Sequence, residues 1–147
     1  ASPSGPVISP RMFAEFVLPS YRRIIDMFHE HGVDLVVFKS ISNIAPLLPL
    51  VVEAGIDGIW VTQTSDAIDY VELRESYPHL LLIGGLDATV LTQDEDTIRN
   101  EVTAKVPRLL AGGRYLPALD DNPRENVPYG NYVFYRRLLR EVCMDAG

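Results

Sequence analysis

The sequence predicts an α/β fold with a parallel sheet, and three observations support this. Four short apolar segments alternate with helical segments, which is typical of parallel strands joined by right-handed crossovers. The apolar segments are continuous runs, as expected of strands covered on both faces. The chain has 147 residues, 47% hydrophobic and 22% charged, which fits one globular domain spanning residues 1–147. An open doubly wound sheet and a segment of a (β/α)8 barrel both fit this pattern.

A long helix is expected to precede the strands. Ser9 can cap it, and Pro10 suits its first position. Apolar residues recur at three- and four-residue spacings, which indicates one helix face; they are Phe13, Phe16, Val17, Tyr21, Ile24, Ile25 and Phe28. Pro19 lies inside this pattern, so we expect a kink or a break near Leu18. Gly32 is expected to end the helix.

Strands and helices are then expected to alternate to the end of the chain. The predicted strands are 34–38, 57–62, 80–84 and 114–119. The predicted helices are 44–54, 66–77, 94–111 and 129–144. Gly55 should close the first of these helices, and Ser65 or Asp66 should cap the second. The last strand is the least regular, because Pro117 removes one ladder donor.

Composition and missing motifs exclude several functions. The formal net charge of −7 disfavours nucleic-acid binding, which depends on Lys and Arg. Cys143 is the only cysteine, so neither an internal disulfide nor a zinc site of several thiolates can form. No stretch reaches the roughly 20 apolar residues that span a bilayer, and residues 1–10 do not resemble a signal peptide. We therefore expect a cytoplasmic protein without membrane contact, metal or cofactor.

Candidate site residues follow the predicted strands, because ligands bind at the carboxyl ends of parallel strands. Four segments occupy such positions: 39–43, 62–66, 84–87 and 120–124. Lys39 ends an apolar strand and could act as nucleophile, base or anion contact. Alternatively, the aliphatic part of the Lys39 side chain packs on the strand end and its ammonium group lies in water. We favour this second interpretation.

Acidic residues follow the third and fourth predicted strands. Asp87 comes after Gly84 and Gly85, which allow a close approach of a ligand, but it could equally cap a helix that begins near Val90. Asp120 and Asp121 could form an acid/base pair. Neighbouring strand residues point to opposite faces, so at most one should face a site. A solvated turn before Pro123 is their alternative.

A series of ordered fragments gives the sequence a family resemblance. The main ones are 8–13, 18–19, 47–49, 53–58, 71–74, 82–87, 90–91, 112–113 and 127–132. In this order they resemble the carboxyl-terminal half of the uroporphyrinogen decarboxylase superfamily, which includes the decarboxylase of haem biosynthesis and cobamide-dependent methyltransferases. The resemblance covers nearly the whole chain. It implies a (β/α)8 barrel enzyme of the lyase class. This chain would be the second half of that barrel, a (β/α)4 unit preceded by a long helix.

The resemblance also implies roles for particular residues. Asp87, Asp120 and Asp121 would be catalytic; the expected substrate-binding residues are Lys39, Asn43, Gln63, Gly84 and Gly85. The family's first half would supply further arginine and aspartate residues. A homodimer or an N-terminal half-barrel partner would therefore be needed, and a small-molecule ligand could bind between the halves.

The sequence departs from the family pattern at three places that bear on its activities. Methyltransferase members carry a His-x-Cys-Gly-Asn zinc segment where this chain has Lys39 to Asn43, so Lys39 replaces the histidine and Ile41 the cysteine. The decarboxylase histidine falls at or near Asp120, and a related subgroup reads Asp-His at Asp120–Asp121. Gln63 stands where related members tend to have glutamate. Two hypotheses therefore remain: a half-barrel enzyme acting on a tetrapyrrole or a methylated small molecule, or a non-catalytic half-barrel that self-assembles and binds at most a small ligand.

Overall fold

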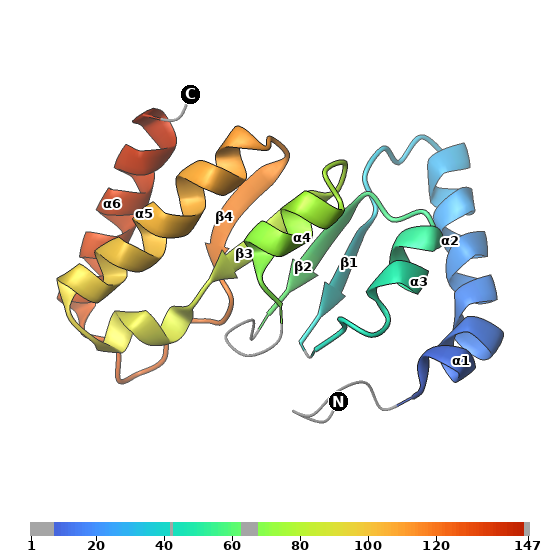
Figure 1. Cartoon of the computed structure of the whole chain (residues 1–147), viewed down its shortest axis with the longest axis horizontal. Coiled ribbons are helices and arrows are strands. Elements are labelled where there is room, and N and C mark those ends of the chain that lie inside the picture. Colours follow the sequence, from blue (N-terminus) through green and yellow to red (C-terminus); the bar gives the residue numbers. More distant parts are fainter. Residues whose placement is uncertain (1–7, 42, 63–67, 146–147) are drawn as a thin grey trace.

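The computed structural model of the chain describes residues 8–41, 43–62 and 68–145. Within these ranges, four parallel strands form one sheet in the order β1-β2-β3-β4 (Figure 1). The strands are β1 (Val37–Ser40), β2 (Gly58–Val61), β3 (Leu81–Leu86) and β4 (Tyr115–Leu119). The predicted α/β class with parallel strands is confirmed.

Helices precede, connect and follow the strands. The N-terminal element consists of α1 (Pro10–Met12), the π-helical segment η1 (Phe13–Val17) and α2 (Leu18–Glu30). The later helices are α3 (Leu48–Glu53), α4 (Tyr70–Ser76), the 3-10 segment η2 (Ala88–Thr92), α5 (Glu95–Ala111) and α6 (Tyr129–Asp145). None of the helices in the described ranges is long and apolar enough to cross a membrane.

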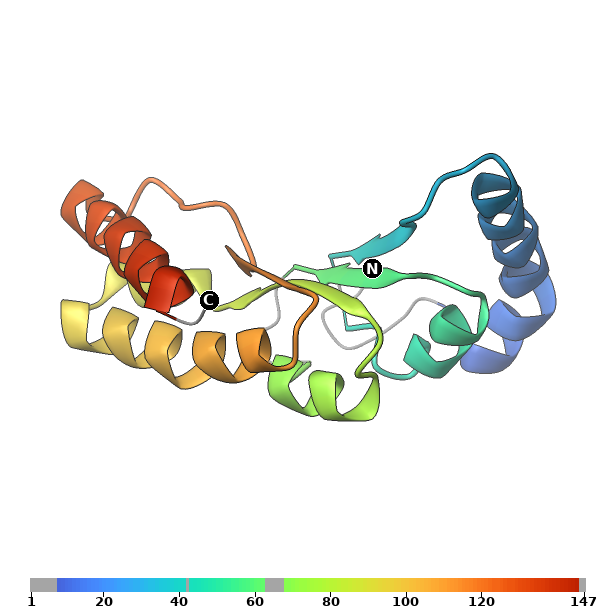
Figure 2. The ribbon, with the colours of Figure 1, turned by 90° about the horizontal axis from the view of Figure 1, so that it is seen from above.

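Each strand lies beside its predecessor in the chain, with the helices distributed unevenly around the sheet. Helices α3, α4 and α5 lie along one face, while α2 and α6 stand at the two ends (Figure 2). A doubly wound sheet reverses its strand order at a switch point, and the described strands show no reversal. The order therefore agrees with consecutive strands of a TIM-type barrel and disfavours the doubly wound alternative.

The two faces of the sheet differ in burial. Ile59, Val61 and Leu82 are 0% exposed and belong to the core beneath the helices. Residues of the opposite set, which alternate with these, are partly or largely exposed: Trp60 is intermediate and Leu116 is 54% exposed. Burial on both faces, expected from the apolar runs, is therefore wrong for this chain. No helix in the described ranges covers the second face, which we call the open face.

The N-terminal element follows the sequence prediction closely. The Ser9 side chain caps it by accepting a hydrogen bond from Met12 N at 3.2 Å. The predicted irregularity near Leu18 takes the form of η1, in which the Leu18 N–H donates to the Phe13 carbonyl, five residues back. Pro19 then occupies the first turn of α2, where a missing N–H costs no hydrogen bond. The helix is therefore interrupted without being broken.

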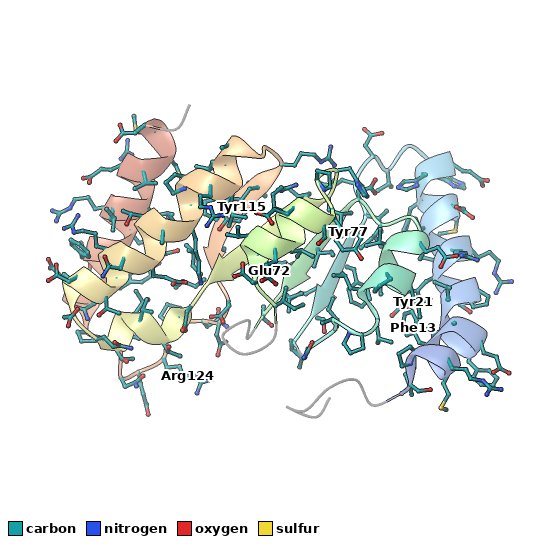
Figure 3. The ribbon with its side chains drawn as sticks, viewed as in Figure 1. Phe13, Tyr21, Glu72, Tyr77, Tyr115 and Arg124 are labelled. Carbon is teal, nitrogen blue, oxygen red and sulfur yellow. The ribbon has the colours of Figure 1, made fainter. Side chains whose placement is uncertain are left out.

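Aromatic packing attaches this element to the first strand. Phe13 and Tyr21 lie together at one end of the N-terminal element (Figure 3), with ring centroids 5.7 Å apart and planes at 88°. Tyr21 also contacts the ring of Phe38 on β1, at a centroid distance of 6.1 Å. Edge-to-face pairs of this kind stabilise a core beyond the area that they bury. The long helix is thereby fixed at the β1 end of the sheet.

Several predicted boundaries are corrected by the structure. Strand β1 begins later than predicted and continues through Ser40, because the Ser40 carbonyl still accepts a hydrogen bond from Thr62 N at 2.9 Å. Helix α3 begins at Leu48 instead of Ile44, with proline in its first turn. Helix α4 is capped by Asp69; the predicted caps Ser65 and Asp66 lie outside the described residues.

A buried arginine ties the amino ends of two strands to α4. Arg74 is 7% exposed and donates hydrogen bonds to the carbonyls of Pro78, Leu80 and Arg114 at 2.8–2.9 Å. Gly112 allows this, since a Cβ atom there would lie 2.8 Å from the Arg74 side chain. Burial and the nearby Arg114 charge lower the pKa of Arg74. Its charge is therefore solvated by backbone carbonyls in place of water.

Candidate functional site

The carboxyl ends of the four strands meet at one edge of the sheet, the lower edge in Figure 1. The residues that the sequence predicts for the site come from or follow these ends. The structure brings Asp87 and Asp120 together there and places Lys39 on the open face. Gln63 lies outside the described residues.

Lys39 is part of β1 and does not follow it, contrary to the prediction. It pairs in register with Trp60 on β2, and its Nζ lies 4.1 Å from the centroid of the indole ring. A lysine over an indole is attracted by the negative face of the ring. Since Lys39 is exposed, its ammonium remains accessible to an anion beside an aromatic surface.

Asp87 has the capping role that the sequence offered as one alternative. Its Oδ1 accepts a hydrogen bond from Thr89 N at 2.8 Å at the start of η2. Its own N–H donates to Glu101 Oε1 at 2.8 Å, and Glu101 pairs with Lys105 at 2.5 Å. Asp87 Oδ2 forms no hydrogen bond with the described part of the chain. One oxygen of this half-buried carboxylate is therefore available to a ligand.

Asp120 and Asp121 have different surroundings, as their alternation on the strand predicted. Asp120 is 3% exposed and accepts a hydrogen bond from Ala88 N at 2.9 Å. Asp121 turns toward solvent and pairs with Arg124 at 2.9 Å, at the lower edge of Figure 3. The Arg124 hydrogen bond and the Asn122 N–H lower the pKa of Asp121. The two carboxylates therefore have different hydrogen-bond partners, and Asp121 matches the predicted solvated turn.

Strand β3 continues through Leu86, so Gly85, which was predicted to follow the strand, lies inside it together with Gly84, the predicted last residue. Both have positive φ angles, +105° and +85°, which glycine adopts without steric cost. A Cβ atom on Gly85 would come within 2.7 Å of the Tyr70 ring. Gly85 therefore makes room for a side chain of the protein itself, the ring of Tyr70.

Two buried tyrosines, which were not predicted from the sequence, hydrogen-bond to the backbone of β3 at and beside the two glycines with positive φ angles. The Tyr70 hydroxyl donates to the Ile83 carbonyl at 2.8 Å and accepts from Val61 N at 3.0 Å. The Tyr115 hydroxyl donates to the Gly84 carbonyl at 2.8 Å. Burial raises the pKa of Tyr70 to about 12 and also raises that of Tyr115. The only sequence signal was the Gly-Gly pair, which does not name its partners.

Asn43 and Ile41 belong to the segment that aligns with the methyltransferase zinc motif, whose zinc ligands this chain was predicted to lack. Asn43 Oδ1 accepts a hydrogen bond from Ala45 N at 2.9 Å, a turn that leads toward α3. Ile41, in the position of the methyltransferase cysteine, is 64% exposed. Within residues 8–41, 43–62 and 68–145, no group of three or more His, Cys, Asp or Glu side chains could hold a metal ion.

Comparison with known proteins agrees with this architecture. A family model described as Uroporphyrinogen decarboxylase (URO-D) matches residues 3–118. The match includes β1, β2 and β3 and ends inside β4. No curated protein matches the sequence.

Proposed function

Because the chain belongs to the uroporphyrinogen decarboxylase family, we propose that it is the carboxyl-terminal half of a (β/α)8 barrel. We propose further that it binds a carboxylate-rich ligand of the tetrapyrrole type at the carboxyl-end edge of its open face, where the strands end at the mouth of the barrel. A complementary half-barrel, in the same polypeptide or a second one, would cover this face. The sequential strand order and the one-sided helices support this architecture.

The single observation that carries the ligand class is the Lys39–Trp60 pair. A ligand carboxylate can pair with the Lys39 ammonium while an apolar ring system rests on the indole and on neighbouring Ile83 and Leu116. Lys39, Trp60, Ile83 and Leu116 occupy one register row across the four strands. Small-molecule sites are usually mostly apolar surfaces with a few polar groups.

Different roles follow for the acidic residues. Asp87 would contact the ligand through its unbonded Oδ2 and could exchange a proton with it. Asp120 would act as a positioning residue, since it holds Ala88 N and thereby the segment next to Asp87. Asp121 is the weakest candidate for the reaction because Arg124 already binds it. Decarboxylation or methyl transfer would further require groups from the complementary half.

A second function, a half-barrel without catalysis that self-assembles and binds at most a small ligand, is favoured by one specific observation. Asp87, Asp120 and Asp121 each accept a hydrogen bond from a backbone N–H at a turn or segment start. Such bonds are sufficient to explain why acidic residues stand there.

The ligand proposal can be tested with the fluorescence of Trp60, the only tryptophan in the chain. Uroporphyrin, a porphyrin with several carboxylates, should quench this fluorescence in a saturable titration. Removing the ammonium with Lys39→Met should weaken binding about tenfold, the effect of losing one charged hydrogen bond. Arg140→Met is the control for loss of a positive charge, because Arg140 is exposed in α6, away from the Lys39–Trp60 pair. Equal affinity of both variants would contradict the proposal.

A further inference from the structure

A charged pair lies on the side of α5 (Glu95–Ala111) that faces the core. Val102 and Leu109 on this side are each 1% exposed. Lys105 follows Val102 by three positions and precedes Leu109 by four, so it shares their side of the helix. It pairs with Glu101, and the side chains of Lys105 and Glu101 are only 35% and 15% exposed. An ion pair loses hydration when it is buried and is then a weak source of stability. The pair therefore points to a role beyond packing.

The pair contacts the backbone on both sides of Leu86, the last residue of β3. Glu101 Oε1 accepts a hydrogen bond from Asp87 N at 2.8 Å. Lys105 Nζ lies 3.4 Å from the carbonyl oxygen of Gly85, on the other side of Leu86. Both contacts come from the face of the sheet that α3, α4 and α5 cover (Figure 2). The pair therefore holds the carboxyl end of β3 from behind, where the chain leaves the sheet toward η2.

The next two backbone N–H groups also donate to carboxylates. Ala88 N donates to Asp120 Oδ1 at 2.9 Å, and Thr89 N donates to Asp87 Oδ1 at 2.8 Å. Three successive N–H groups are thus each directed at the carboxylate of a different residue. These bonds fix the main chain at Asp87 and one oxygen of its carboxylate. Only the second oxygen, Oδ2, is left without a hydrogen bond to the described residues.

We propose that Glu101 is a positioning residue for the ligand site and that Lys105 supports it. The inference rests on the proposed function, in which Asp87 Oδ2 contacts the ligand. Glu101 holds the N–H of the residue that carries this oxygen, so it sets the position of the carboxylate without touching the ligand itself. Lys105 holds the Glu101 carboxylate in place through the ion pair. Sites that bind with precision depend on such supporting contacts behind the residues that touch the ligand.

Titration with uroporphyrin, followed by the fluorescence of Trp60, tests the role of Glu101. Glu101→Met removes the acceptor of the Asp87 N–H and should weaken binding about tenfold. Glu101→Gln keeps a side-chain oxygen that can accept this bond and should restore most of the affinity. Loss of a negative charge would by itself strengthen the binding of an anionic ligand. Weaker binding by Glu101→Met would therefore identify the backbone contact, and not the charge, as the cause.

Combination with Asp87→Asn separates positioning from a general loss of structure. Asparagine keeps an oxygen that can accept the hydrogen bond from Thr89 N but lacks the carboxylate. If Glu101 acts through Asp87, Glu101→Met should weaken binding no further in the Asp87→Asn background. Circular dichroism should show equal helix content for all variants. Equal weakening by Glu101→Met in both backgrounds would overturn the proposal, as would an unchanged affinity of the single variant Glu101→Met.

Amide hydrogen exchange of the free protein, measured by NMR, tests the contact without a ligand. Glu101→Met should accelerate exchange of the Asp87 amide about tenfold, whereas Glu101→Gln should keep it slow. The Ala88 amide, which donates to Asp120, is the internal control and should not change. Unchanged exchange at Asp87 would overturn the positioning role. Slow exchange at Asp87 in a wild-type chain that binds no uroporphyrin would instead overturn the proposed function, and with it the ligand-site role of Glu101.

Discussion

The ring of Tyr70 lies directly against the backbone of Gly85, where a Cβ atom would come within 2.7 Å of it. Tyr70 comes from α4 and reaches between the ends of β2 and β3. Its hydroxyl bonds to backbone groups of both strands. The bend of β3 just before Asp87 therefore depends on a contact between residues 15 positions apart in the sequence.

Gly85→Ala should destabilise the fold strongly. The added methyl group meets the Tyr70 ring, and alanine must also adopt a φ of +85°. We expect a loss of about 2–4 kcal/mol in the free energy of unfolding, from strain and overpacking together. Gly113→Ala is the control, since Gly113 has a φ of +67° and no atom within 4 Å of the added Cβ. It should cost only about 1 kcal/mol. Equal losses in urea unfolding would show that the Tyr70 contact is unimportant.

Tyr70→Phe should cost stability and change its dependence on alkaline pH. Removal of the hydroxyl leaves Val61 N and the Ile83 carbonyl unpaired, which should cost about 1–3 kcal/mol near neutral pH. Burial raises the pKa of Tyr70 to about 12 from its ordinary 10.0. A raised pKa favours the folded state fully below pH 10, and this contribution is lost as the pH rises toward 12.

The variant should therefore lose less stability than the wild type between pH 10 and about 12. If the free energy of unfolding fell equally with pH in both proteins over that interval, the buried position of the hydroxyl would be contradicted. Tyr77→Phe serves as a control for removal of a tyrosine hydroxyl, because the Tyr77 hydroxyl has no hydrogen-bond partner among the described residues.

Arg74→Lys should destabilise the amino ends of β3 and β4. One ammonium cannot donate to three carbonyls in the directions that the planar guanidinium reaches. We expect a loss of at least about 2 kcal/mol, since hydrogen bonds to charged groups are among the stronger ones. Arg108→Lys is the matched control, because its ion pair with Glu75 is 3.9 Å long and its side chain is 66% exposed. Its effect should stay within about 0.5 kcal/mol. Denaturant unfolding measures both losses. Equal losses for the two variants would contradict the stabilising role of the Arg74 hydrogen bonds.

Asp57→Asn should alter stability on the acid side. Asp57 Oδ2 accepts hydrogen bonds from Val36 N at 2.8 Å and from His29 at 2.9 Å. Partial burial raises the pKa of Asp57, but these bonds and the charges of His29 and Arg114 lower it more, to below 3.8. The ionised carboxylate therefore stabilises the fold above pH 3.8, and this contribution disappears as the pH falls through the lowered value.

The wild-type advantage over Asp57→Asn should accordingly be about 1 kcal/mol near neutral pH and should vanish in acid. Thermal unfolding across this pH range provides the measurement. Asp26→Asn, at an exposed position of α2, should follow the wild-type curve. A constant difference at all pH values would exclude the charge as the cause.

Local sequence signals predicted the parts of this structure that depend on local physics. Apolar runs and helix periodicity gave the alternation of strands and helices. Ser9 was predicted as a cap from its position, and capping was one of two alternatives for Asp87. Pro117 stands in a terminal strand of the described sheet, as its missing N–H requires. Asp120 and Asp121 separate because neighbouring residues of an extended segment alternate in direction.

The contacts that shape the candidate site could not be predicted in the same way. Trp60 is recognisable as a strand residue, but only the register of β1 and β2 places it under Lys39. Tyr70 and Tyr115 act on β3 from other elements, so no spacing in the sequence reveals them. Gly84 and Gly85 suggested an open approach for a ligand, whereas the Tyr70 ring fills the space at Gly85.

The most direct test of the central claim is a complementation assay with the N-terminal half of a family decarboxylase. The account predicts that the mixture releases carbon dioxide from uroporphyrinogen faster than the sum of the two separate halves. Lys39→Met in this chain should reduce the gain, while Arg140→Met, at an exposed position of α6, should leave it unchanged. No gain over the separate halves would contradict the account and favour a half-barrel without catalysis.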